Sequence, residues 1–193
     1  MTDRGKGRDL ETYEIVLVGV MAAMVYVVTL FRFPLLGSKV HFANAVCLLC
    51  GMLLGPVQGG VAAGLGSALF DATGGGYDVI QIVITFASKF AMAFVCGLLM
   101  HRGEKSRGRM DRTVVSSVAG ALTYVALYML KTFIYDRYVH GHPLNVAFAT
   151  MGSKLPASLI NAAAAVIAAP IFYHAAMPAL RAGGLGKKLY TKE

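Results

Sequence analysis

Three lysines lie inside long apolar stretches of this sequence: Lys89, Lys131 and Lys154. A charged side chain at membrane depth costs about 2.5–3.5 kcal/mol on insertion scales, unless it faces the protein interior or a wet cavity. Each lysine therefore needs an interaction that offsets this cost. It either pairs with a carboxylate of the chain, extends its ammonium group to the membrane surface, or lines a pocket for an anionic ligand.

The three lysines also belong to rows of polar side chains. Residues three or four positions apart lie on the same face of a helix, so each row marks one polar helix face. We predict that these three faces meet in one substrate-binding pocket in the outer half of the membrane. The rows are Gln81, Thr85, Ser88 and Lys89; Tyr124, Tyr128, Lys131 and Tyr135; and Thr150, Lys154, Ser158 and Asn161.

Nearby acids keep a structural interpretation of the lysines open. Asp71, Asp78 and Asp136 lie near the same predicted end of the membrane domain, and an ion pair with one of them would hold helices together. Lys89 has the weaker case for a substrate contact, because an acid such as Asp71 would neutralise it. Lys131 is only about one turn from the end of its apolar stretch, so it can also extend to the surface.

The loops at this end contain two further candidates. Three glycines at 74–76 precede Tyr77 and Asp78, so this loop is either a lid that closes over a ligand or a flexible connector. We include both residues in the predicted substrate site. His140 and His142 are too few for a zinc site, which takes at least three protein ligands, so we predict no metal site.

No set of residues in the sequence indicates catalysis. The chain has no GxxxxGK[ST] phosphate loop, so we do not expect it to hydrolyse ATP. Cys47 and Cys50 form a CxxC motif, but both lie in an apolar stretch, whereas redox-active cysteines need an electropositive, partly exposed setting. We therefore predict neither an enzyme nor a bound cofactor.

Composition indicates a membrane protein. Hydrophobic residues make up 56% of the 193 residues and charged residues only 15%. The net charge of +8 would suit nucleic acid, but the positive residues occur in short blocks between apolar stretches, not along one amphipathic face. These features exclude a nucleic-acid-binding domain.

The apolar stretches predict an all-α membrane protein with six transmembrane helices in a compact bundle. Pro34 ends the first stretch and residues 34–40 are predicted to form a loop, while Gly55 and Pro56 form a tight turn between the second and third. Residues 1–12 form a basic N-terminal segment, 13–176 the membrane domain and 177–193 a basic tail. The six stretches are 13–33, 41–54, 57–71, 79–100, 113–135 and 146–176, the last with bends at Pro156 and Pro170.

Lysine and arginine counts orient the helices, because cytoplasmic segments carry an excess of both. Cytoplasmic termini leave only Arg32, Lys39 and Arg137 outside. We therefore predict that both termini are cytoplasmic. The inner segments then contain twelve cations: Arg4, Lys6, Arg8, Arg102, Lys105, Arg107, Arg109, Arg112, Arg181, Lys187, Lys188 and Lys192.

The second and third stretches carry a pattern that resembles a known family, the substrate-binding subunits (S components) of energy-coupling factor (ECF) vitamin transporters. The similarity extends over residues 13–175 and is weaker outside this hairpin. The pattern reads HxxNA…LLxGxLLGPxxGxxAxGxGSALxD, and the residues that match it are His41, Asn44, Ala45, Gly51, Leu54, Gly55, Pro56, Gly59, Ala63, Gly64, Gly66, Ser67, Ala68 and Asp71.

The resemblance implies a ligand site in the outer region, between helices four to six and the outer loops. It implies partners: a transmembrane coupling subunit and two ATPase subunits, in the plasma membrane of a prokaryote. Gly19 and Ala23 on the first helix resemble the family's contact with the coupling subunit, and Gly55 and Gly59 of the hairpin extend the predicted docking surface.

The predicted function is a high-affinity binding subunit that captures a small, anionic heteroaromatic vitamin from outside. In the family, such a subunit reorients in the membrane to deliver the substrate. The three lysines suit a carboxylate or phosphate, and the tyrosines suit a ring. The alternative is a stand-alone secondary transporter or channel, although the sequence has no evident inverted repeat.

Overall fold

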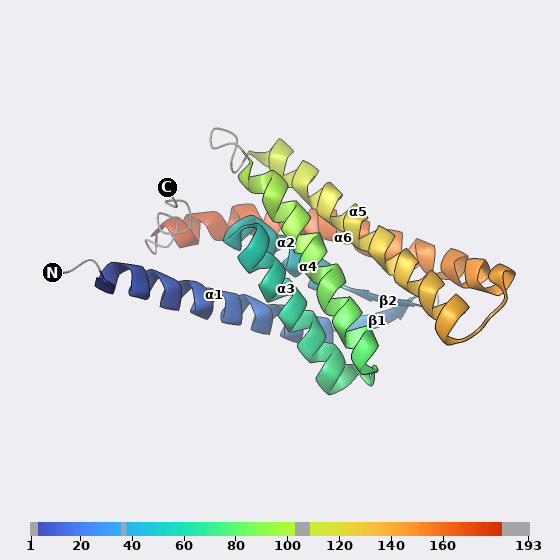
Figure 1. Ribbon diagram of the computed structural model, residues 1–193. Helices are drawn as coiled ribbons and strands as arrows, with labels where there is room; N and C mark the ends of the chain where they lie inside the picture. The colour runs from blue at the N-terminus through green and yellow to red at the C-terminus, as the bar shows by residue number, and fades with distance from the viewer. Residues whose placement is uncertain (1–3, 36–37, 103–108, 183–193) are drawn as a thin grey trace.

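The computed structural model describes residues 4–35, 38–102 and 109–182, and it shows a bundle of six helices (Figure 1). The all-α fold class is confirmed. The helices are α1 (Arg4–Leu30), α2 (Ala43–Leu54), α3 (Pro56–Phe70), α4 (Val79–His101), α5 (Met110–Ile134) and α6 (Leu144–Ala182). Between them lie strands β1 (Arg32–Leu35) and β2 (Ser38–His41) and the π-helical turns η1 (Asp71–Gly75) and η3 (Tyr135–Val139).

Four of the helices are long and apolar enough to cross a membrane. These segments are Thr12–Leu30, Val79–His101, Met110–Val139 and Leu144–Leu180. The other two helices, α2 and α3, have 12 and 15 residues, fewer than the about 20 that a bilayer requires. Six spans with cytoplasmic termini therefore stay a prediction. The start of α1 and the end of α6 do lie at the same end of the bundle (Figure 1).

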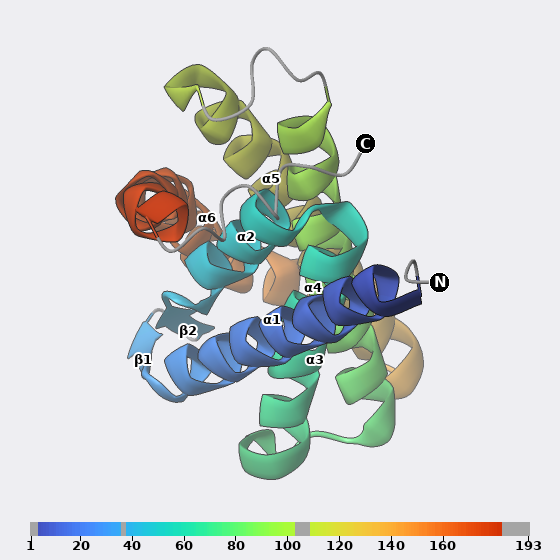
Figure 2. The same ribbon diagram turned by 90° about the vertical axis from the view of Figure 1, so that its left-hand side faces the viewer.

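The short helix α2 is the centre of the bundle. Every residue from Ala43 to Leu53 is buried, and α2 contacts each of the other five helices. Figure 2 shows α6 on one side of it and α1 and α3 on the other. A helix that is apolar on all sides is stable only when it is surrounded in this way. At Gly51 the α2 backbone approaches α4 so closely that a Cβ would overlap the Ala93 carbonyl oxygen.

The predicted turn between α2 and α3 is present. Gly55 has φ = 86°, a conformation that favours glycine, and Pro56 is the first residue of α3. On α3, a Cβ at Gly60 or Gly64 would collide with a phenylalanine ring of α4. The small residues of the hairpin therefore let α2 and α3 pack tightly against α4.

The prediction of a loop at residues 34–40 is wrong. Residues on both sides of the turn form an antiparallel pair, with Arg32 opposite His41 and Phe33 opposite Val40. Pro34 does prevent the helix from continuing. In the hairpin the backbone N–H and C=O groups of the two strands pair with each other, which an open loop would leave to water. Residues 36 and 37 lie outside the described residues.

Other boundaries also differ from the prediction. The 73–77 connection is partly helical, because η1 continues α3 as a π-helical turn before Gly76, which has φ = 65°. The first helix begins at Arg4 and the last continues to Ala182, so parts of the two basic terminal segments are helical. The remainder of those segments, and Lys105 and Arg107 of the connector, lie outside the described residues.

Candidate substrate-binding site

A cavity of about 500 Å³ lies among the helices predicted to bind substrate. That volume is typical of a site for a small molecule. One wall consists of α4, α5 with η3, and α6: Gln81, Thr85, Ser88, Lys89, Tyr124, Tyr128, Lys131, Thr132, Tyr135, Asp136, Lys154, Ser158 and Asn161. The remaining lining residues come from the N-terminal half and the loops: Thr29, Arg32, Asn44, Ser67, Phe70, Asp71, Tyr77 and His140.

The structure brings together nine of the eleven predicted substrate-site residues: Lys89, Lys131, Lys154, Gln81, Thr85, Tyr124, Tyr128, Asn161 and Tyr77. Two others are not part of the lining. The Thr150 hydroxyl donates a hydrogen bond to the Val146 carbonyl of its own helix (3.0 Å). The Asp78 carboxylate caps α4 by accepting a hydrogen bond from the backbone N–H of Gln81 (2.7 Å).

Lys89 is held by two contacts within the protein. Its side chain is buried, and Nζ donates a hydrogen bond to Oδ1 of Asn44 on α2. The same Nζ lies 3.8 Å from the centre of the Tyr124 ring on α5, which is cation–π distance. The partners of this lysine are therefore the Asn44 amide and the Tyr124 ring, and not Asp71, which the sequence suggested as an example. Lys89 joins α2, α4 and α5 at one point.

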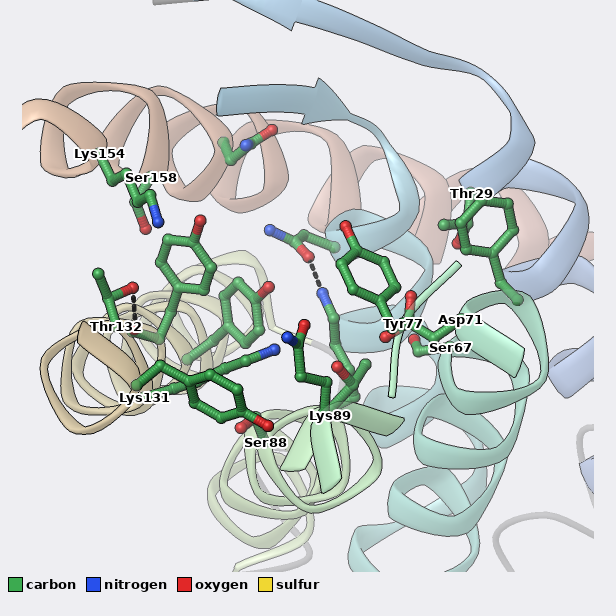
Figure 3. A pocket seen from close by; sticks show the side chains of 18 of the residues that line it. Thr29, Ser67, Asp71, Tyr77, Ser88, Lys89, Lys131, Thr132, Lys154 and Ser158 are labelled. Atoms are coloured by element: carbon green, nitrogen blue, oxygen red, sulfur yellow. Dashed lines mark hydrogen bonds between the residues drawn. The ribbon is translucent and has the colours of Figure 1, made fainter. Parts of the chain in front are cut away.

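Lys131 has a looser environment. It is half-buried, and its Nζ lies 5.9 Å from the ring centres of both Tyr77 and Tyr135. Figure 3 shows Lys89 and Lys131 extending into the cavity, while Lys154 and Ser158 lie on the α6 wall. Within the described part of the chain, no carboxylate lies within ion-pair distance of the Lys131 or Lys154 Nζ. Both ammonium groups are available to a ligand.

The two carboxylates of the lining come from equivalent places in the fold. Asp71 begins η1 directly after α3, and Asp136 is the second residue of η3 directly after α5. A π-helical turn widens the helix, and such turns often occur at functional sites. Four cationic side chains and these two acids line the cavity, so its lining has an excess of two positive charges when His140 is neutral.

Residues of the lining also contact one another or neighbouring segments. The Tyr135 hydroxyl donates a hydrogen bond to Asp78 (3.2 Å), which connects η3 to the start of α4. The Arg32 guanidinium lies 4.6 Å from the centre of the Phe70 ring. The His140 and His142 rings stack with their centres 5.6 Å apart, and the described residues contain no group of three or more potential metal ligands.

Sequence reasoning missed part of the lining. The sequence indicates Asn44 only as part of a family pattern. It is, however, the one amide side chain between residues 42 and 54, and a lone polar residue in an apolar helix could have indicated a contact with another polar group. Arg32 was counted only as an outer-loop cation. Thr29 and Ser67 each have a charged lining residue at helical spacing, Arg32 three positions and Asp71 four positions further on, and this spacing is the signal that could have indicated them.

The predicted docking residues divide into two pairs. Gly19 and Ala23 are exposed on α1, and nothing lies within 4 Å of a Cβ built at Gly19. Gly55 and Gly59 are buried, and a Cβ at Gly59 would overlap the backbone of Cys50. Gly59 therefore lets the two helices of the hairpin pack closely, and Gly55 forms the turn between them. Docking of a partner on any of these four residues stays a prediction.

Comparisons with known proteins agree with this geometry. The family model described as "ECF-type riboflavin transporter, S component" matches residues 9–177. A solved structure of the S component of a bacterial ECF transporter superimposes with a TM-score of 0.67 at 14% sequence identity, over 89% of this chain and 99% of that one. No curated protein sequence matches the chain. At this identity the solved structure shows a shared fold.

Proposed function

The chain belongs to the ECF-type riboflavin transporter S component family, and we propose that it is the substrate-binding subunit of an ATP-driven vitamin importer. The observation that carries this proposal is the cavity. It is polar and charged within a chain that is 56% hydrophobic, and it collects side chains from all six helices or their connections. Polar and ionisable groups inside a membrane protein mark a ligand path or site.

The lining favours a compact anionic heteroaromatic substrate. Lys131 and Lys154 supply positive charge without internal ion pairs, and an anionic group between them would form charge-assisted hydrogen bonds. The Tyr124 and Tyr128 rings are stacked, with centres 6.1 Å apart, and offer an aromatic surface. A ring bearing a carboxylate or phosphate satisfies both features.

The chain requires partners for uptake against a gradient. Its sequence contains no phosphate-binding loop for ATP, so ATP hydrolysis would come from two ATPase subunits joined by a transmembrane coupling subunit. The exposed face of α1 around Gly19 and Ala23 would dock that coupling subunit. The cavity would face outward to capture substrate, and reorientation of the whole subunit in the plasma membrane of a prokaryote would deliver it inward.

Binding and uptake measured separately test this function. We expect the purified protein to retain a small molecule that native mass spectrometry identifies, and to bind it without ATP. Cells that produce this chain alone should not accumulate the molecule, whereas cells that also produce a coupling subunit and its ATPases should. Accumulation by the chain alone would favour a stand-alone secondary transporter.

A further inference from the structure

The tip of the α5–η3–α6 hairpin extends beyond the other elements, at the end of the bundle opposite the start of α1 and the end of α6 (Figure 1). Large apolar side chains are exposed all around this tip. An exposed group of large apolar side chains usually marks an interaction surface. The group, called here the tip cluster, consists of Ile134 (41% exposed), Val139 (59%), Leu144 (52%), Val146 (38%) and Phe148 (56%).

The tip cluster continues the apolar surface of two candidate membrane segments. One segment is Met110–Val139, which includes all of η3, and the other is Leu144–Leu180, which begins with the first residue of α6. Only residues 140–143 separate them. Because the apolar surface runs without a break from both segments into the tip, the occupant that fits the tip cluster is the lipid bilayer itself.

The lengths of the two segments set the depth of the tip. Met110–Val139 has 30 residues and rises roughly 45 Å, at about 1.5 Å per residue. The hydrocarbon core of a bilayer is about 30 Å thick, and the whole bilayer with its headgroups about 40–45 Å. The second segment is longer still, with 37 residues, so it has to tilt or to extend past the core. Both lengths carry the tip beyond the hydrocarbon core and into the headgroup region.

The other side chains at the tip suit the headgroup region. Tyr138 is 75% exposed, and tyrosine is enriched at membrane interfaces because its ring is apolar and its hydroxyl polar. Arg137, His140 and His142 are also exposed there, beside the tip cluster. The tip therefore combines apolar groups for the acyl chains with polar and cationic groups for the phosphates, whereas a loop surrounded by water gains nothing from the apolar ones.

We propose that the tip cluster is an interfacial membrane anchor, which inserts Val139, Leu144 and Phe148 among the headgroups and first acyl carbons of the adjacent leaflet. Interfacial segments bury their apolar side chains about 5–10 Å into this boundary. Tyr135 and Asp136 of η3 line the cavity, so the anchor would also fix the depth of that cavity wall in the membrane. The anchor does not depend on which molecule the cavity binds.

Single-tryptophan variants test the depth of the tip directly, because the sequence contains no tryptophan. Leu144→Trp and Phe148→Trp are placed in phosphatidylcholine vesicles whose acyl chains carry bromine at either a shallow or a deep carbon. We expect the shallow bromine to quench both tryptophans more strongly than the deep one. Leu122→Trp is the reference, since Leu122 is exposed midway along α5, and the deep bromine should quench it more strongly.

His142→Trp is the matched control, because this exposed polar position lies only two residues before Leu144. Iodide on both sides of the membrane should quench it more strongly than Leu144→Trp. If iodide quenches all three tip variants alike and bromine quenches none, the tip lies in water and the anchor is wrong. Protection of Leu144→Trp and Phe148→Trp from both quenchers would indicate a protein contact, such as a second copy of the chain, and would also overturn the proposal.

A spin label provides a second measurement if a tryptophan variant does not fold, which its melting temperature would reveal. Val139→Cys can be labelled selectively with a nitroxide, because Cys47, Cys50 and Cys96 are buried. We expect the nitroxide to be more accessible to oxygen, which dissolves in lipid, than to a water-soluble nickel chelate. Greater accessibility to the nickel chelate would overturn the proposal, and neither result depends on the transport function.

Discussion

Lys89 and Lys131 carry the same charge in the same cavity, but their surroundings give them different roles. Lys89 is buried, with its Nζ bound to Asn44 and placed over the Tyr124 ring. Lys131 has aromatic neighbours at 5.9 Å and interacts electrostatically with Asp71 and Asp78, but it forms no ion pair with either. Removing a partner from a buried polar group is costly, whereas removing a free charge from a cavity is not. Lys89 should therefore act mainly in stability and Lys131 in binding.

Replacing Lys89 tests this division of roles. Lys89→Met removes a charge-assisted hydrogen bond and leaves Oδ1 of Asn44 without its donor, so we expect a loss of about 1.5–3 kcal/mol in the free energy of unfolding. The loss should appear as a lower melting temperature of the purified protein. Lys131→Met is the control, and its melting temperature should stay near that of the parent. A stable Lys89→Met protein would mean that α2 does not depend on this contact.

For single residues, the sequence predicts which side chains share a helix face but not which side chains meet between helices. The spacing of Lys131 and Tyr128 on α5 placed them on one face, because side-chain direction in a helix follows from residue number alone. The partner of Lys89 was not predictable in this way. Asn44 lies 45 residues earlier on another helix, and only the packing of α2 against α4 brings the two side chains together.

Among the elements, the helices were easier to predict than what joins them. Long apolar stretches and their ends at Pro34, Gly55 and the charged connector predicted six helices, with every boundary within about three residues except the start of α1 and the end of α6. The β1–β2 hairpin and the two π-helical turns had no comparable signal in the sequence. They depend on backbone pairing and on local widening of a helix end, neither of which follows from hydrophobic periodicity.

The crossing of α2 and α4 should be sensitive to a single methyl group. A Cβ at Gly51 would overlap the Ala93 carbonyl oxygen, and backbone atoms cannot move aside as a flexible side chain can. We expect Gly51→Ala to cost about 1–3 kcal/mol, as overpacking does. Thermal unfolding of the purified protein measures this effect.

Gly19→Ala is the matched control for that substitution. Nothing lies within 4 Å of a Cβ at Gly19, so the new methyl group meets no protein atom. Alanine also favours a helix over glycine by up to about 1 kcal/mol. The control should therefore melt at or slightly above the parent temperature. Equal destabilisation by both substitutions would show that α2 and α4 do not cross as closely as described.

At the scale of the whole molecule, the charge bias predicts that the η3 end is external and the connector between α4 and α5 cytoplasmic. Tyr138→Cys and Met110→Cys introduce thiols at exposed positions of these two ends. The native cysteines Cys47, Cys50 and Cys96 are buried and should not react. An impermeant thiol reagent added to whole cells should label only Tyr138→Cys, and labelling of both variants would contradict the predicted orientation.

The exposed face of α1 is the surface that we propose for docking the coupling subunit. Gly19 and Ala23 form a smooth strip, and exposed valines such as Val16, Val20 and Val27 flank it. Small residues allow the backbone of another helix to approach closely, whereas a lipid-facing surface gains nothing from them. A coupling subunit that docks on this strip would meet α1 without touching the cavity, so docking and substrate binding should be separable.

Gly19→Leu and Ala23→Leu place a bulky side chain where the coupling subunit would approach α1 closely. Each should therefore weaken docking and reduce uptake by about tenfold or more in cells that contain the complete transporter. Affinity for the substrate should stay within about twofold of the parent, because the only cavity-lining residue that α1 contributes is Thr29, further along the helix toward its C-terminal end. Ala126→Leu is the control, since Ala126 is exposed on α5, away from this strip. An equal loss of binding and uptake would indicate a folding role for Gly19 and Ala23, and unchanged uptake would place the docking surface elsewhere on the bundle.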